Sequence, residues 1–462
     1  MANEVIVVGG GIAGLSCAWR LSRQGFQVEV LEAQEELGGN VRSEVRGGFL
    51  MERGPHTFMR SADDIFVLAK ELGIEGEILG SRPEAEARFI VRKQRLCAVP
   101  SGPWSFLTTR LLSARGKIKL VGEPLRTQRG KPDDSAEQFF SRRFGPEGAR
   151  VLAGAFISGV YAGDARTLSA PAAFPLFWRF EQESGGMLRG GLAHRKKMKA
   201  LRAAQGLSLD LRPKGLSSFR QGLGQLIDAL GAQLGDRCRT RCAVRGIGRE
   251  GGRFVVKTDQ GERRAEHLVL AVPPPEARAA LQGLNPALAD LLGRIPMAPV
   301  AVVYLGYDRR LPSVPDGFGF LAPRDEGVRA LGVLFPSRLF DGRAPGAGDL
   351  LTAYVGGVQD PVALQLDDAS LSRIVTNDLA KLLGLSTAQV FVRVLRHPTA
   401  IPQFTLGHLE RFQKIQSLVR EIPGLFLAGN YLRGVGMKDA VGSDFEAAMN
   451  VTQHRQTRTS AS

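Results

Sequence analysis

The chain has 462 residues, of which 44% are hydrophobic and 23% are charged, so we expect more than one domain and exclude a mainly disordered chain. Its 61 Lys and Arg residues outnumber 46 Asp and Glu residues, which gives a net charge of +15. The basic clusters contain no DNA-binding motif and no interleaved aromatic residues, so we expect no nucleic-acid partner. An anionic membrane surface and an acidic small molecule both remain candidate partners for this charge.

No apolar run reaches the roughly 18–20 residues that a membrane-spanning helix needs, and the segment 151–163 comes nearest. The first four residues carry no basic charge of the kind that opens a secretory signal. The four cysteines, Cys17, Cys97, Cys238 and Cys242, are too few and too scattered for a disulfide framework or a complete zinc site. We therefore expect a cytoplasmic protein without a metal.

The first predicted elements are a strand at Glu4–Val8, a glycine turn, a helix from Ile12 to about Gly25, and a strand at Gln27–Leu31. Within about 30 residues they form a dinucleotide-binding fingerprint, G-x-G-x-x-G between a strand and a helix. Gly9 makes the tight turn, and Gly11 lets the backbone approach a pyrophosphate. Gly14 lets the helix pack closely on the strand.

The helix start and the end of the second strand provide two further predicted contacts with the cofactor. The N–H groups around Ile12 and Ala13, with the positive end of the helix dipole, suit the phosphates. Glu32, followed by Ala33, suits the ribose hydroxyls. An acid at this position argues against a 2′-phosphate, so FAD or NAD is favoured over NADP.

A second glycine pair follows directly and separates FAD from NAD. Gly38-Gly39-Asn40, with Arg42 close behind, resembles the flavin-linked motif of the amine oxidase and carotenoid desaturase superfamily. Such a motif would supply further backbone amides and one guanidinium group to bind the same pyrophosphate. Asn40 stands where that superfamily often has a basic residue, so we expect Arg42 to pair with the charge alone.

The middle of the chain is predicted to be helical, beginning with a capping box at Ser135 and Gln138. The pattern also predicts strands at 254–258 and 267–272, and strands at 300–305 and 351–355, which suggest a separate sheet. The first two strands resemble the return of that superfamily's chain to the flavin domain. A last strand at 424–430 ends in Gly-Asn, and a helix follows from about Val441.

Five separated stretches carry a resemblance that covers essentially the whole chain. They are Glu52–Phe58, Gly159–Asp164, Gly317–Pro323, Tyr354–Gly357 and Ile401–His408. In this order, between two flavin-like ends, they resemble the oxygen-dependent protoporphyrinogen oxidase family of the flavin amine oxidase superfamily. The resemblance implies an α/β fold with a discontinuous Rossmann-like FAD-binding domain, an α+β substrate-binding domain and a helical membrane-contacting region. The implied boundaries are 1–85, 215–295 and 405–462 for FAD, 86–97 and 296–404 for substrate, and 98–205 for the helical region.

The implied activity is the six-electron oxidation of protoporphyrinogen IX to protoporphyrin IX by O2, with non-covalent FAD and H2O2 formation, before the last step of haem synthesis. We assign no catalytic side chain, because the pyrrole nitrogens of the macrocycle can take and release protons. One alternative is the same oxidation of coproporphyrinogen III. Others are a flavin amine oxidase or desaturase, and a flavin-binding protein without catalysis.

The family pattern also implies which residues contact the substrate. Arg88 would bind a propionate, since a guanidinium binds a carboxylate with two parallel hydrogen bonds. The other implied contacts are apolar side chains or backbone, which would serve equally well in a core: Gly159, Phe318, Leu321, Leu334 and Tyr354.

Further cofactor contacts are implied along the chain. The backbone of Val244 would hold the adenine, Gly429 and Asn430 would close on the pyrophosphate, and His397 stands where relatives commonly have tryptophan. The remaining implied positions are Gly54, Pro55, His56, Thr57, Ala271, Val435, Gly436 and Met437.

The basic charge has a candidate reason in this resemblance. The helical region would rest on the inner face of an anionic membrane as a peripheral contact, with Trp104–Leu107 as a wedge. A buried helix pair is the alternative. A homodimer is an option that no single residue supports.

Overall fold

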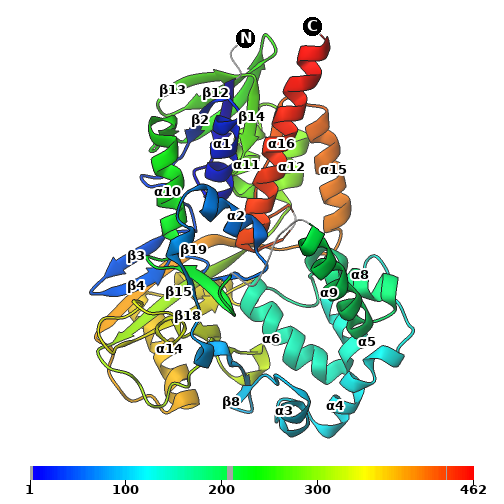
Figure 1. Ribbon diagram of the computed structural model, residues 1–462, viewed down its shortest axis with the longest axis vertical. Helices are drawn as coiled ribbons and strands as arrows, with labels where there is room; N and C mark the ends of the chain where they lie inside the picture. The colour runs from blue at the N-terminus through cyan, green and yellow to red at the C-terminus, as the bar shows by residue number, and fades with distance from the viewer. Residues whose placement is uncertain (1–3, 205–211, 433, 462) are drawn as a thin grey trace.

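The computed structural model describes residues 4–204, 212–432 and 434–461. Residues 1–3, at the N-terminus where a secretory signal would begin, and residue 205, at the end of the expected helical region, lie outside them. The chain forms three neighbouring parts: a parallel sheet with helices, a larger mixed sheet, and a group of helices (Figure 1). No helix among the described residues is both long and apolar enough to cross a membrane.

The first part is built on a five-stranded parallel sheet in the order β10-β2-β1-β14-β20. Its strands are β1 (Glu4–Val8), β2 (Gln27–Leu31), β10 (Cys238–Arg239), β14 (His267–Leu270) and β20 (Leu425–Leu427). Apolar runs flanked by helices are typical of a parallel sheet that is buried on both faces. Sequence patterns predicted four of these strands. They missed β10 because a strand of two residues is too short to show an alternation of apolar and polar residues.

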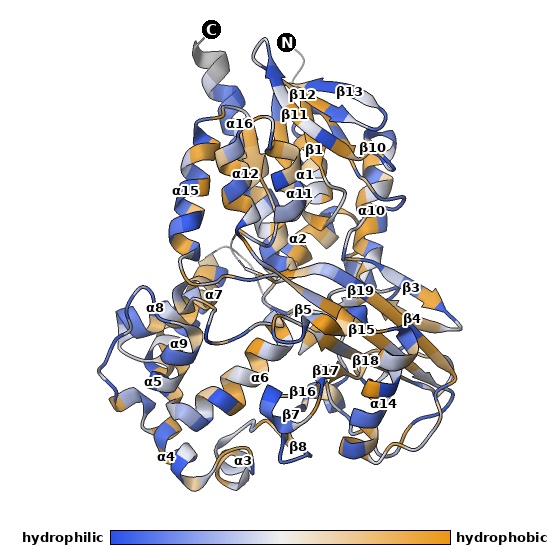
Figure 2. Cartoon of the chain, turned by 180° about the vertical axis from the view of Figure 1, so that it is seen from behind, coloured by the Kyte–Doolittle hydropathy of each residue, from blue (hydrophilic) through white to orange (hydrophobic). Residues whose placement is uncertain are grey.

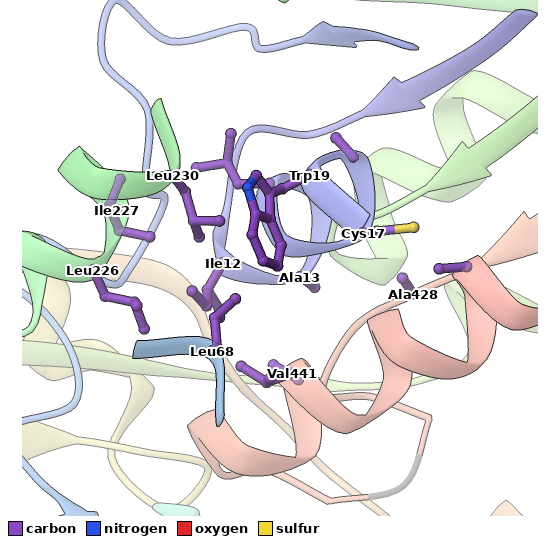
Figure 3. Packing of buried hydrophobic residues seen from close by; sticks show 14 of the residues in the cluster. Ile12, Ala13, Cys17, Trp19, Leu68, Leu226, Ile227, Leu230, Ala428 and Val441 are labelled. Carbon is purple, nitrogen blue, oxygen red and sulfur yellow. The ribbon is translucent and has the colours of Figure 1, made fainter. Parts of the chain in front are cut away.

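Helices from distant parts of the chain cover one face of this sheet. They are α1 (Ile12–Arg23), α2 (Asp63–Glu71), α10 (Gly224–Leu234) and α16 (Met437–Ala461). Figure 3 shows Ile12 and Ala13 of α1 close to Val441 of α16, with Leu226 and Leu230 of α10 nearby. The predicted last helix begins at Met437, four residues before the expected Val441, because Asp439 accepts a hydrogen bond from the Gly436 backbone and caps it.

The other face is covered by a small antiparallel sheet and by further helices. The sheet comprises β11 (Val244–Glu250), β12 (Arg253–Thr258) and β13 (Gly261–Ala265), and the helices are α11 (Pro274–Leu281), α12 (Pro286–Gly293) and α15 (His408–Arg420).

The second part is a seven-stranded sheet in the order β19-β15-β18-β17-β16-β7-β8, in which only β16 and β7 are parallel. It comprises β7 (Arg88–Arg92), β8 (Arg95–Ala98), β15 (Met297–Tyr307), β16 (Gly319–Leu321), β17 (Ala330–Leu334), β18 (Asp349–Gly356) and β19 (Phe391–Pro402). Helix α14 (Asp368–Leu383) packs on one face of the sheet. The predicted separate sheet is confirmed, since β15 and β18 are neighbours in it.

The helical part runs between β8 and residue 204. It comprises α3 (Pro103–Thr108), α4 (Ala114–Val121), α5 (Ala136–Gly148), α6 (Gly154–Phe156), α7 (Ala170–Ala173), α8 (Pro175–Ser184) and α9 (Met187–Ala204). The predicted capping box is confirmed, because Ser135 Oγ accepts from the Gln138 backbone and Gln138 Oε1 accepts from the Ser135 backbone. Figure 2 shows that α8 and α9 carry many hydrophilic residues, whereas β15 of the seven-stranded sheet is largely hydrophobic.

Short elements join these parts. They are β3 (Ser43–Arg46), β4 (Phe49–Glu52), β5 (Phe58–Met59), β6 (Ile78–Gly80), β9 (Leu216–Phe219) and α13 (Pro336–Leu339).

Candidate active site

The glycine turn after β1 is shaped by close backbone contacts. Gly9 has φ +107°, and a Cβ added there would lie 2.5 Å from the carbonyl oxygen of Ala271. A Cβ at Gly14 would overlap the carbonyl oxygen of Gly9. At Gly11 no atom lies within 4 Å of an added Cβ. The turn therefore needs glycine at two positions for packing and leaves open space at the third, in front of the N-terminus of α1.

Glu32 is held at the end of β2 beside this turn. Its Oε2 accepts a hydrogen bond from the Gly10 backbone at 2.6 Å, and its Oε1 accepts one from the Gln34 backbone at 2.8 Å. Its carboxylate is thus oriented by the backbone, and the next residue, Ala33, is exposed. The contact with a ribose stays a prediction.

The second glycine pair lies directly against the first turn. The Gly38 backbone N–H donates to Gly10 O at 2.7 Å, and Gly11 and Gly38 form an isolated parallel bridge. A Cβ at Gly39 would lie 3.5 Å from Gly11 Cα. Arg42 completes the motif, and its Nη1 lies 2.8 Å from both Leu37 O and Glu36 Oε2.

The segment after β4 returns to the same place. A Cβ on Gly54 would overlap the backbone oxygen of Asn40, so only glycine allows this approach. Pro55 and Thr57 are half-buried here, and the His56 ring is buried. Burial, followed by the positive charge of Arg343, lowers the pKa of His56 to about 3, so its ring is neutral at physiological pH.

Glu52 joins these segments, and the sequence analysis names it only as the first residue of the stretch Glu52–Phe58, without a role in the site. Its Oε2 accepts from the Ser43 hydroxyl at 2.6 Å and its Oε1 from the Leu223 backbone at 2.8 Å. Ser43 Oγ in turn accepts from the Gly224 backbone at 2.9 Å, where α10 begins. The signal that could have found it is an acid at the end of the apolar run Phe49–Glu52, a strand that is buried throughout.

The remaining predicted cofactor contacts surround the same region. The Cys242 backbone donates to Glu32 O at 2.8 Å, which brings Val244 at the start of β11 close to the end of β2. The Ala271 backbone N–H donates to Val8 O at 2.8 Å, and the carbonyl group of Ala271 packs against Gly9.

The segment before α16 provides the last of these contacts. The Gly429 backbone donates to Ser443 Oγ at 2.8 Å, and Asn430 Nδ2 donates to Val435 O at 3.5 Å. Gly436 is fixed by Asp439, and Met437 is buried among residues of α1 and α16.

These residues fit a dinucleotide cofactor. The space beside Gly11 is open and lies at the N-terminus of α1, where free backbone N–H groups bind a pyrophosphate well.

The predicted substrate residues come together on the seven-stranded sheet. Arg88, Gly319 and Leu334 are aligned across β7, β16 and β17, and Leu321, Gly332 and Tyr354 are aligned across β16, β17 and β18. Aligned residues share a face, and so do residues two apart in a strand. Arg88, Leu321, Leu334 and Tyr354 therefore lie on one face, opposite the face that α14 covers.

Gly159 lies against this face, whereas Phe318 does not belong to either row. A Cβ on Gly159 would overlap the Leu321 side chain, so its backbone contacts the sheet directly. Phe318 packs with Ala85, Leu339 and Phe340, and the Arg88 guanidinium lies 5.8 Å from its ring centre.

The cofactor segment and this sheet face meet at one aromatic contact. The rings of His56 and Tyr354 lie 6.2 Å apart in an edge-to-face arrangement. The segment 54–57 therefore contacts both the second glycine motif, through Gly54, and this sheet face, through His56. Such a link suits an enzyme that holds a flavin nucleotide beside an apolar substrate.

Comparison with known proteins agrees with this class. Residues 12–452 match the flavin containing amine oxidoreductase family, and the chain belongs to this family. It is 34% identical to the chloroplastic protoporphyrinogen oxidase of Nicotiana tabacum, over 97% of this chain and 85% of that protein. It is 27% identical to the coproporphyrinogen III oxidase of Bacillus subtilis, over 95% of this chain and 96% of that protein.

A solved structure from Exiguobacterium sp. 255-15, provisionally named a protoporphyrinogen oxidase, superposes with a TM-score of 0.83 at 26% identity and covers 99% of both chains. The protein is accordingly an FAD-dependent oxidoreductase with a flavin amine oxidase-type fold. When bound, FAD accepts electrons from the substrate, while the protein positions the two and excludes water.

Proposed function

We propose that this enzyme oxidises protoporphyrinogen IX to protoporphyrin IX, with three O2 consumed and three H2O2 formed per macrocycle. The proposal is carried by the single sheet face that presents Arg88 beside Leu321, Leu334 and Tyr354. One cation next to apolar side chains matches an apolar macrocycle that bears propionates. Support also comes from relatives of that name that align along nearly the whole chain.

The residues have distinct roles in this proposal. Arg88 binds a propionate, Leu321 and Leu334 contact a pyrrole ring, and Tyr354 faces the ring from the other side. The backbone at Gly159 contacts the macrocycle at a place where a side chain would not fit beside Leu321. The Phe318 ring packs against the Arg88 guanidinium and contacts the substrate next to it. No side chain is assigned as a general base, since the pyrrole nitrogens themselves release protons.

The cofactor is held non-covalently in this proposal. The N–H groups at the N-terminus of α1 and those of the second glycine pair bind the pyrophosphate, together with Arg42, and Glu32 binds a ribose. Val244 holds the adenine, and the segments 54–57 and 435–437 lie along the flavin ring.

The test is the growth of porphyrin fluorescence in air from freshly reduced protoporphyrinogen IX. The flavin-loaded protein should exceed both a heat-killed sample and free FAD, and peroxide should form alongside at about three per porphyrin. If flavin-loaded protein gives no increase over autoxidation, the proposal is wrong.

Coproporphyrinogen III is the second candidate substrate, because the Bacillus subtilis relative is named for it and aligns along almost the whole chain. Its four propionates would require more cations around the site than Arg88. Measuring kcat/KM for both substrates with one preparation decides between them, and we expect the ratio to favour protoporphyrinogen IX.

We further propose that the helical region, 98–205, rests on the inner face of an anionic membrane and that the protein is otherwise cytoplasmic. Support comes from apolar side chains that face solvent on α3 and α4. Trp104 is 77% exposed, Leu107 63%, Ile118 72% and Val121 67%. Exposure of this degree argues against the alternative of a buried helix pair. The basic helix α9 adds attraction to anionic lipid.

The division into regions is part of the same proposal. The FAD domain comprises 1–85, 215–295 and 405–462, which supply the strands of the parallel sheet, and the substrate domain comprises 86–97 and 296–404. The homodimer stays a prediction of the family resemblance, and sedimentation equilibrium tests it.

A further inference from the structure

A fully buried acid joins the last helix to the helix that begins at the first glycine turn. Asp444 of α16 and Ser16 of α1 are both 0% exposed, and Asp444 Oδ2 is in hydrogen-bond contact with Ser16 Oγ. Ser16 lies one turn after Ile12, the first residue of α1. The contact therefore reaches the turn whose N–H groups are predicted to bind the pyrophosphate.

The hydroxyl of Ser16 contacts two oxygen atoms but carries only one proton. Ser16 Oγ lies 2.5 Å from the backbone oxygen of Ile12, which can only accept, so the proton of Ser16 lies in this bond. The contact with Asp444 Oδ2 then needs a second proton, because two oxygens at hydrogen-bond distance repel each other without one. Of these groups, only the carboxyl group of Asp444 can carry that proton.

The charges around Asp444 would compensate a carboxylate only in part. Arg20 Nε of α1 lies 3.6 Å from Oδ1, too far for a hydrogen bond, and Nη1 of Arg20 lies 3.8 Å from Glu71. Oδ1 is buried and accepts no hydrogen bond from any described residue. Strand β20, which also packs on α16, carries apolar residues only.

These surroundings favour the neutral form of the acid. Burial raises the pKa of Asp444 well above its usual range, the positive charge of Arg20 opposes this shift, and the negative charge of Asp64 on α2 adds to it. Burial and the neighbouring Asp444 likewise raise the pKa of the Cys17 thiol on α1, so this thiol stays protonated and provides no charge.

We propose that Asp444 is protonated at neutral pH and acts as a positioning residue for the cofactor. Its proton bonds Ser16, and the proton of Ser16 bonds the Ile12 carbonyl, so the acid holds the first turn of α1 in one arrangement against α16. The cofactor role rests on the proposed placement of the pyrophosphate at this turn. The protonation of Asp444 does not.

Three variants separate this role from simple packing. In D444N the side-chain amide donates from the place of Oδ2 and carries no charge, so it imitates the protonated acid. In D444L the donor is lost, although the side chain still fills the space. S16A keeps the acid and removes the hydroxyl between it and Ile12, and it is the variant to use if D444L does not fold.

Infrared difference spectra of the holoenzyme at neutral pH, unmodified minus D444N, measure the protonation state. We expect the carbonyl stretching band of a protonated carboxyl group, with a shift to lower frequency in D2O. The buried acid Glu52 is present in both proteins, so its bands cancel. Carboxylate bands in place of the carbonyl band would overturn the proposal.

Flavin fluorescence on release and rebinding of FAD then measures the positioning role. We expect D444N to bind FAD within about 2-fold of the unmodified protein, and D444L and S16A to bind it about 5-fold more weakly, as loss of one buried hydrogen bond does. Rescue by D444N is the outcome that a packing role does not predict, because D444L would then bind FAD as well as D444N.

The positioning role is overturned if D444L and S16A both bind FAD within about 2-fold of the unmodified protein. It is also overturned if D444N is weakened as much as D444L, because the native group would then have to be the charged carboxylate. A wrong placement of the pyrophosphate is distinguishable, since G11A would then leave FAD affinity unchanged while the infrared band of Asp444 would still be present.

Discussion

The hydroxyl of Ser43 donates a 2.6 Å hydrogen bond to the carboxylate of Glu52, across the hairpin of β3 and β4. Because the same two side chains accept from the Leu223 and Gly224 backbones, the hairpin is attached to the first turn of α10. Ser43 directly follows Arg42 of the second glycine motif. The position of that motif against the first glycine turn therefore depends in part on a buried acid.

Replacing Glu52 with Gln is expected to change the pH dependence of stability. Burial raises the pKa of Glu52 from 4.5 to about 7, despite the opposing hydrogen bonds from Ser43 and Leu223. Since the pKa is higher in the folded state, stability is lost as pH rises from about 4.5 to 7, by about 3 kcal/mol. Urea unfolding at pH 5 and pH 8 should show that the unmodified protein loses more stability than E52Q over this interval. Equal losses would contradict the assignment.

Two substitutions in the first glycine turn should act differently. An alanine at Gly14 would overlap the Gly9 carbonyl oxygen, so G14A should cost about 3 kcal/mol of stability or prevent folding. Gly11 has φ −75° and open space beside it, so G11A should leave the stability of the flavin-free protein within about 1 kcal/mol. It should nevertheless weaken FAD binding about tenfold, because the methyl group enters the space predicted for the pyrophosphate. Calorimetry and flavin titration measure the two effects, and unchanged FAD affinity in G11A would rule out this placement.

Removing the predicted propionate contact should affect substrate binding. We expect R88A to raise KM for protoporphyrinogen IX about 10-fold or more, as loss of a charged hydrogen bond does, with little change in FAD affinity. Arg95, exposed on the neighbouring strand β8, provides the control, and R95A should behave like the unmodified enzyme. Steady-state kinetics under saturating oxygen test this. Equal KM values for R88A and R95A would show that Arg88 does not bind the substrate.

Membrane contact should depend on the exposed side chains of α3. The protein should sediment with anionic vesicles at low salt and be released at high salt. The double variant W104S/L107S should reduce the bound fraction several-fold, whereas V45S, at an equally exposed apolar position on β3, should not. If the protein does not sediment at low salt, the membrane proposal is wrong.

Local sequence patterns were enough for the parts of this protein that depend on neighbours in the chain. The strand, turn and helix from Glu4 to Arg23, the capping box at Ser135 and the strands β15 and β18 all follow from short-range periodicity and backbone requirements. The requirement for glycine at Gly9 and Gly14 could also be inferred, since both belong to a fingerprint with a known mechanical role.

The tertiary structure alone decided which distant residues meet. Register and packing between segments determine the hydrogen bond of Ser43 to Glu52 and the place of β10 beside β2. They also determine the row of Leu321, Gly332 and Tyr354. No periodicity in one segment encodes the register of another.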